Sequence, residues 1–111
     1  MAYGLLIDTE WCSGCHTCEM ACQMHNDLPV GQTGIIVQEI GPWEIGGGDW
    51  QLSYLPALTK QCDGCAGRVA EGKRPTCVQH CQAWCMYHGE VDDLVKKMDG
   101  KTRWALLTTK N

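Results

Sequence analysis

Short apolar segments alternate with polar and glycine-rich stretches along the chain, and they predict a mixture of strands and helices. The apolar run at residues 3–7, which ends at Asp8 and Thr9, predicts a first strand. Residues 16–25 are rich in helix-forming side chains, and residues 91–98 have the spacing of an amphipathic helix. Shorter helical stretches and further strands are expected at 65–72, 76–80, 84–87 and 104–108. This pattern predicts an α+β fold with a helix near its C-terminal end.

Residues 28–60 separate two cysteine-containing regions and form a predicted insertion. Residues 35–40 are rich in β-branched side chains and predict a strand that stops at residues 41–42. Apolar and polar residues alternate at 50–54, which predicts a partner strand across a glycine loop. We expect a hairpin here, within one domain at 1–111, because no linker is long enough to divide the chain into two cores.

Charge and hydropathy narrow the class of protein. The 111 residues carry a formal net charge of −4 and no basic stripe, which argues against a nucleic-acid partner. No apolar run reaches the roughly 18 residues that predict a membrane span. Residues 1–8 lack the features of an export signal, so we expect a cytoplasmic protein whose thiols stay reduced. Export in a folded complex with a signal-bearing partner stays open as an alternative.

Four of the nine cysteines form a dense first group, Cys12, Cys15, Cys18 and Cys22. The C-x2-C-x2-C-x3-C spacing is the one by which bacterial ferredoxins bind [4Fe–4S] clusters. Three thiolates of such a run bind one cluster, and the fourth reaches the other cluster. The first group therefore predicts an iron–sulfur protein.

The second group is Cys62, Cys65, Cys77 and Cys81, and Cys85 follows it. Its C-x2-C-x11-C-x3-C spacing is also compatible with a zinc ribbon, so spacing alone leaves both metals open. Since the first group already predicts a cluster, the simplest arrangement is an exchange of ligands between two [4Fe–4S] clusters. The first predicted set is Cys12, Cys15, Cys18 and Cys81, and the second is Cys62, Cys65, Cys77 and Cys22.

Both groups resemble motifs of one known family. Residues 12–22 (CSGCHTCEMAC) resemble the first cysteine motif of the iron–sulfur electron-transfer subunits of molybdenum and tungsten oxidoreductases, the dimethyl sulfoxide reductase family. Residues 62–81, with Arg68, Gly72 and Pro75 between the cysteines, resemble the fourth motif of these subunits. The first and fourth motifs pair in that family, so the resemblance implies a dicluster ferredoxin-like domain reduced to two clusters.

The resemblance, which covers residues 3–27 and 50–93, also implies a function. It implies a non-catalytic subunit that relays electrons to or from a larger catalytic subunit containing molybdenum, tungsten or flavin. The sequence contains no phosphate-binding loop and no nucleophile motif of its own. A free soluble ferredoxin and a structural zinc protein remain the alternatives.

The chain departs from the family motif after Cys81. Gln82 replaces the usual proline and restores a backbone N–H group, which predicts a raised potential for the nearby cluster. Residues 83–85 (AWC) stand where small residues are usual. We expect Cys85 to be a buried thiol outside the ligand set. The alternatives are that Cys85 replaces Cys81 as a ligand or that it serves in redox sensing.

Several side chains outside the cysteine groups also have an expected role. His16 and His80 are expected to form hydrogen bonds near the clusters, because eight cysteines already suffice as ligands. Arg68 is expected to make a specific contact, since it matches the family motif. The five tryptophans predict either a docking surface or shielding and core packing; they are Trp11, Trp43, Trp50, Trp84 and Trp104.

Overall fold

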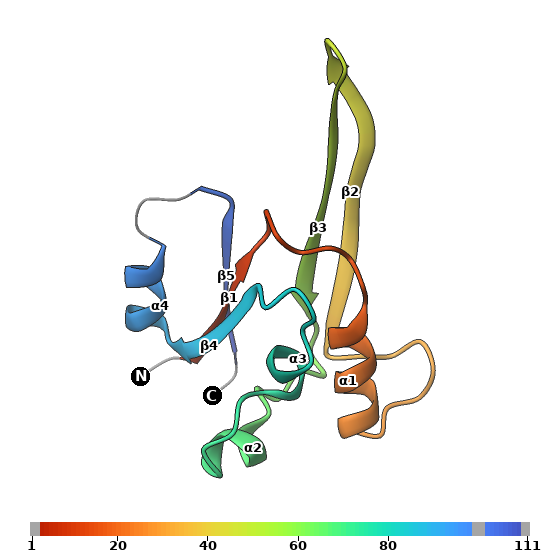
Figure 1. Cartoon of the computed structure of the whole chain (residues 1–111). Helices are drawn as coiled ribbons and strands as arrows, with labels where there is room; N and C mark the ends of the chain where they lie inside the picture. The colour runs from red at the N-terminus through yellow and green to blue at the C-terminus, as the bar shows by residue number, and fades with distance from the viewer. Residues whose placement is uncertain (1–2, 99–101, 110–111) are drawn as a thin grey trace.

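The computed structural model describes residues 3–98 and 102–109, and these residues form two antiparallel sheets and four helices (Figure 1). In chain order the elements are β1 (Tyr3–Asp8), α1 (Thr17–His25), β2 (Ile35–Gly46), β3 (Asp49–Leu58), α2 (Ala66–Ala70), α3 (Thr76–Gln79), β4 (Met86–Glu90), α4 (Val91–Lys97) and β5 (Trp104–Thr108). The predicted α+β class is confirmed.

The first sheet has three strands in the order β4-β1-β5. The central strand β1 is antiparallel to both neighbours, and Leu5 faces His88 on one side and Leu107 on the other. Leu5, Leu6 and Ile7 are at most 2% exposed, so the first apolar run of the sequence is the centre of the sheet. Helix α4 contacts β4 and β1 and buries Leu94.

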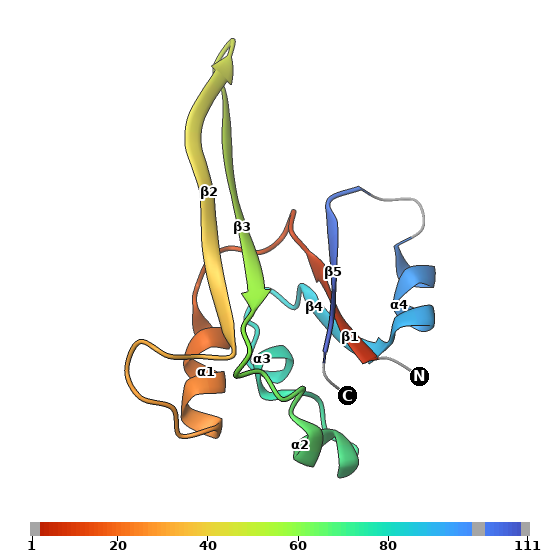
Figure 2. The same cartoon turned by 180° about the vertical axis from the view of Figure 1, so that it is seen from behind.

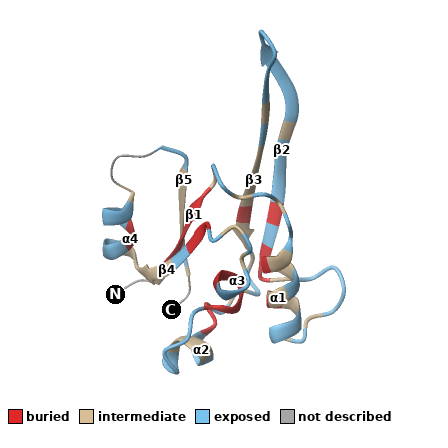
Figure 3. Cartoon of the chain, in the orientation of Figure 1, coloured by how far each residue is buried: buried red, intermediate tan, exposed pale blue. Residues whose placement is uncertain are grey.

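The second sheet is the hairpin β2–β3, which projects away from the other elements in both views (Figures 1 and 2). Its lower part contains buried residues (Figure 3), and these include Ile35, Val37 and Pro56. Its outer part is exposed, including Trp43 and Trp50. The structure thus confirms a hairpin between the two cysteine groups.

The hairpin strands are longer than the sequence pattern predicts. We expected the first strand to stop at residues 41–42, but β2 continues to Gly46. The pairing shifts register between Ile40 and Trp43, and this irregularity accommodates Pro42 within the ribbon. A proline is tolerated there because a two-stranded ribbon has a free edge on each strand.

The remaining boundaries agree with expectation within a few residues, with one correction. The strand expected at 84–87 begins at Met86, because Trp84 has a left-handed backbone with φ of 56° and lies outside the sheet. Trp84 is also 72% exposed, and the guanidinium carbon of Arg74 lies 5.5 Å from its ring centre.

Core packing is the wrong interpretation for four of the five tryptophans. Those exposed by more than half are Trp11, Trp43, Trp50 and Trp84. Only Trp104 is half-buried among the five, in β5. The alternative role as a docking surface stays a prediction. Among the described residues, no helix has both the length and the apolar character required to cross a membrane.

Candidate metal centre

Helix α1 carries two cysteines of the first group. Cys18 and Cys22 are four residues apart on one face of the helix, and each is only 6% exposed. His16 precedes the helix with a left-handed backbone, φ of 62°, which turns the chain from the cysteine loop into α1. The helix contacts α3, which contains Cys77, so the two cysteine groups meet in the fold.

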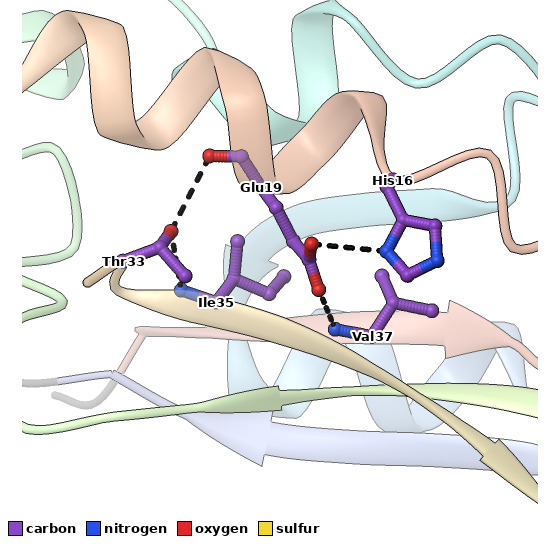
Figure 4. Close-up of polar contacts among 5 residues, drawn as sticks. All are labelled: His16, Glu19, Thr33, Ile35 and Val37. Carbon is purple, nitrogen blue, oxygen red and sulfur yellow. Dashed lines mark hydrogen bonds and ion pairs between the residues drawn. The ribbon is translucent and has the colours of Figure 1, made fainter. Parts of the chain in front are cut away.

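Glu19 fixes α1 to the lower part of the hairpin (Figure 4). Its carboxylate accepts hydrogen bonds from the ring Nδ1 of His16, at 2.9 Å, and from the backbone N–H of Val37. The hydroxyl of Thr33 donates to the Glu19 carbonyl at 3.3 Å. The hairpin is therefore anchored beside both buried cysteines of α1. Nothing in the sequence pattern indicates this role of Glu19.

The second cysteine group is held by local hydrogen bonds. The backbone N–H of Cys65 donates to the Asp63 carboxylate at 2.8 Å, which closes the turn between Cys62 and Cys65. Arg68 donates from Nε to the Arg74 carbonyl at 2.9 Å and also donates to the side chain of Gln79. The specific contact expected of Arg68 is confirmed, since it links α2 and α3 across the segment that carries the cysteines.

The predicted ligands lie around two separate cavities. The first cavity contains three cysteines of the first group and one of the second among its lining residues, Cys12, Cys15, Cys18 and Cys81. The second cavity is lined by Cys22, Cys62, Cys65 and Cys77. Each motif therefore contributes three cysteines to one cavity and one cysteine to the other.

The cysteines differ in their access to solvent. Cys18, Cys22, Cys65 and Cys77 are buried, while Cys15, which lines the first cavity, is exposed. Cys18, Cys22 and Cys77 also belong to one contiguous buried cluster with Leu5 and Ile7. The two cavities thus share a common apolar core, and Cys15 is the exposed cysteine of the first cavity.

Cys85 is a fifth cysteine in the first cavity. It is 3% exposed, and its Sγ lies 3.6 Å from Sγ of Cys81. The prediction of a buried thiol is confirmed. Its position against a predicted ligand was not foreseen, because three intervening residues do not fix the relative position of two side chains outside regular structure.

The surroundings set the acidity of the thiols in the first cavity. Hydrogen bonding with Cys85 lowers the pKa of Cys81 to about 5 and that of Cys12 to about 6. Backbone N–H groups of residues 83–85 also lower the pKa of Cys81. The same hydrogen bonds, together with burial, raise the pKa of Cys85. Cys81 and Cys12 are therefore suited to the thiolate form and Cys85 to the thiol form.

Burial dominates for the deeper thiols. It raises the pKa of Cys18 to about 12, and it also raises the pKa values of Cys65 and Cys77. Such groups hold their protons in the absence of a cation. Binding of a metal at these thiols therefore requires the release of protons.

Polar donors point at the cysteines of the second cavity. The side-chain amide of Asn26 donates to Sγ of Cys22 at 3.5 Å, and the backbone N–H of Gly64 donates to Sγ of Cys62 at 3.4 Å. Gly34 is packed between these two cysteines, where a Cβ atom would lie 3.0 Å from Sγ of Cys22. The sequence pattern predicts none of these contacts. Hydrogen bonds to ligand sulfurs are typical of iron–sulfur sites.

His16 and His80 form hydrogen bonds near the cysteines, as expected, and the partner of each bond is an oxygen atom. His16 lines the first cavity and donates to Glu19. His80 donates from Nδ1 to the Thr76 carbonyl at 2.8 Å, beside Cys77. Both therefore have a structural contact close to the candidate site.

The donor set fits an iron–sulfur cluster. Within residues 3–98 and 102–109, no three His, Cys, Asp or Glu side chains converge closely enough to hold a single metal ion. Four predicted ligand thiols line each cavity, which fits an iron–sulfur cluster in which each thiolate binds a different iron.

Comparison with known proteins supports the same type of cofactor. The sequence is 38% identical over 102 residues to one chain of the anaerobic dimethyl sulfoxide reductase of Haemophilus influenzae, and 32% identical over 93 residues to the corresponding chain of Escherichia coli K12. It is 32% identical over 72 residues to a Halobacterium salinarum protein provisionally named as a dimethyl sulfoxide reductase iron–sulfur subunit. No protein-family model matches the sequence.

The matches cover most of this sequence and a smaller part of the relatives. They span 84% of the chain in the first two cases and 55% in the third. The chain spans 43%, 34% and 28% of the length of these three relatives. The resemblance identified in the cysteine motifs is confirmed: the chain is a homologue of the iron–sulfur subunits of the dimethyl sulfoxide reductase family.

Proposed function

We propose that the protein holds two [4Fe–4S] clusters and relays electrons as a non-catalytic subunit of a larger oxidoreductase. One observation carries the proposal: two cysteine motifs about 50 residues apart contribute cysteines in a three-plus-one pattern to two cavities. The first proposed ligand set is Cys12, Cys15, Cys18 and Cys81. The second set is Cys62, Cys65, Cys77 and Cys22.

The residues of the chain would hold and insulate these clusters within a dicluster ferredoxin-like domain. A bound [4Fe–4S] cluster supplies a one-electron redox couple. The buried cysteines and the apolar residues around them exclude water, and the amide of Asn26 and the N–H of Gly64 stabilise the negative charge on the ligand sulfurs. Cys15, the exposed member of the first set, marks the point where an electron has the shortest path to the surface.

The partner in this proposal is a larger catalytic subunit that contains molybdenum, tungsten or flavin. The names of the relatives support it, since they describe one chain of a dimethyl sulfoxide reductase. Exposed tryptophans at the outer part of the hairpin are compatible with burial against such a subunit. A cytoplasmic location belongs to the same proposal. A free soluble ferredoxin is the alternative, and co-purification of a large metal-containing protein from the native host distinguishes the two.

Anaerobic metal analysis tests the cofactor directly. We expect about eight iron atoms and about eight inorganic sulfides per molecule, with reduced-cluster signals in electron paramagnetic resonance. A protein that contains zinc and stays colourless after reconstitution with iron and sulfide would contradict the proposal and favour a zinc ribbon.

Single Cys→Ser variants test the crossed ligand sets. The variants C22S and C77S should remove the same cluster signal, although these cysteines belong to different motifs. The variants C18S and C81S should both remove the other signal. If C22S and C18S removed the same cluster while C77S and C81S removed the other, each motif would bind its own cluster and the crossed arrangement would be wrong.

A further inference from the structure

The first cavity contains one thiol more than a cluster needs. Two clusters with four thiolates each account for eight of the nine cysteines, and Cys85 is left over. Cys85 nevertheless lines the same cavity as the proposed ligands and is 3% exposed. Its Sγ lies 3.6 Å from Sγ of Cys81, which is within the range of a hydrogen bond between sulfur atoms.

The backbone holds Cys85 in this position. Its carbonyl accepts a hydrogen bond from the N–H of Asp8 at 2.8 Å, at the end of the central strand β1. The next residue, Met86, begins β4 and pairs with Ile7 of β1. Because both contacts are made to the most buried strand of the sheet, the thiol is fixed at the wall of the cavity.

The direction of the hydrogen bond follows from the role of each sulfur. A cysteine binds iron as a thiolate, so Cys81 would carry no proton when it is a ligand and would act only as an acceptor. Cys85 then has the only proton that this pair of sulfurs can share. We propose that the Cys85 thiol donates a hydrogen bond to the ligand sulfur of Cys81 and thereby raises the reduction potential of the first cluster.

The sign of this effect is set by charge. Reduction adds one negative charge to the cluster and its ligand sulfurs, and a hydrogen bond strengthens as its acceptor becomes more negative. The donor therefore stabilises the reduced form more than the oxidised form. This inference rests on the proposed function, because it requires a cluster bound by Cys81.

The spacing favours Cys81, rather than Cys85, as the ligand of this pair. Cys81 follows Cys77 in a C-x3-C pair and completes the four cysteines of the second group, with the same final spacing as Cys18 and Cys22 in the first group. Cys85 comes after that group, and its sulfur contacts the sulfur of Cys81. Cys85 thus lies behind a proposed ligand, where it can act on the cluster through that ligand.

Redox titration of the full chain, monitored by electron paramagnetic resonance, tests the proposal. In C85A the equilibrium constant for reduction of the first cluster should fall about three-fold, which is about 28 mV at 59 mV per ten-fold change. In C85S a hydroxyl replaces the thiol as donor, so the potential should stay nearer to that of the wild type. The second cavity is not lined by Cys85, and its cluster serves as the reference within the same molecule.

A matched variant controls for disturbance of the cavity. Met86 is buried, lines the first cavity and has no hydrogen-bond donor in its side chain. M86L changes the packing of the same cavity wall without removing a donor, so its effect on the potential of the first cluster should be much smaller than that of C85A. A shift in M86L equal to that in C85A would assign the effect to packing and would overturn the proposal.

Infrared spectroscopy provides a test in the unmodified protein. With eight cysteines bound to iron, only Cys85 has an S–H group, so its stretching band should be the single one present. The band should move to lower frequency on reduction of the first cluster, as the hydrogen bond strengthens. A missing band would show that Cys85 is itself deprotonated or a ligand and would overturn the proposal.

The remaining outcomes separate this inference from the proposed function. Two results would overturn the inference even if the wild-type protein contains two clusters. One is an unchanged potential of the first cluster in C85A, and the other is loss of the first cluster in C85A with its retention in C81A. Absence of iron and sulfide from the wild-type protein would overturn the proposed function first, and this inference with it.

Discussion

Substitution of Gly34 by alanine tests whether the second cavity depends on close packing around its cysteines. The Cβ atom of an alanine at this position would lie 2.9 Å from Cα of Cys62 and 3.0 Å from Sγ of Cys22. Carbon atoms make their most favourable contacts at about 3.5–4.0 Å, so the Cys62 backbone would have to move by at least about 0.6 Å. The residues that would move are two proposed ligands of the same cluster.

The energetic effect of G34A follows from this overlap. Overpacking of this kind costs about 1–3 kcal/mol. If the cost falls on the ligand geometry, the second cluster should bind between about five-fold and 150-fold more weakly. The first cavity does not include Gly34 among its lining residues, so its cluster should be unaffected.

Cluster loss to an iron chelator under anaerobic conditions, followed by electron paramagnetic resonance, measures the effect. In G34A the second cluster should be lost first, leaving about four iron atoms per molecule. G67A is the matched control, because a Cβ atom at Gly67 would have no other atom within 4 Å. Equal loss rates for both clusters in G34A would refute the reasoning, since the substitution would then not act through Cys22 and Cys62.

Three further predictions concern the first cavity and the hairpin. Q82P removes the backbone N–H group that hydrogen-bonds to Cys15 of the first cavity. If that bond differs by about 1 kcal/mol between the redox states, the potential of the first cluster should fall by about 40 mV in a redox titration. Unchanged potentials would contradict this prediction. In the metal-free, reduced protein, Cys12 and Cys81 should react fastest with iodoacetamide at pH 7, because the thiolate is the reactive form and their pKa values are lowered to about 6 and about 5. The rate at Cys12 should decline as the pH falls through about 6, and the rate at Cys81 as it falls through about 5. Equal rates for all nine thiols, measured by mass spectrometry, would argue against this environment. Trp43 and Trp50 lie on opposite faces of the hairpin, and both are exposed. The double variant W43S/W50S should therefore reduce co-purification of the large subunit without changing the iron content. An unchanged yield of the complex would exclude a role of these tryptophans in docking.

The sequence alone predicted most of the secondary structure and the division of the cysteines. The run of residues 3–7 is apolar at nearly every position, because β1 is flanked by a strand on each side and buried. The spacing of the first cysteine group predicted an iron–sulfur protein, since short intervals within one segment already limit how its thiols can converge. Local pattern was less reliable at Pro42, where a shift in pairing lets the strand continue.

The tertiary structure decided which side chains surround each cysteine. Glu19 and Gly34 gave no distinctive signal in the sequence, because their roles arise from contacts with residues of other segments, such as Val37 and Cys62. Cys85 was predicted to be buried, and only the pairing of β1 with β4 and the turn before it bring its sulfur to 3.6 Å from Cys81. Spacing along the chain specifies which thiols are available to bind metal; packing between distant segments determines the hydrogen bonds, burial and charge that tune their chemistry.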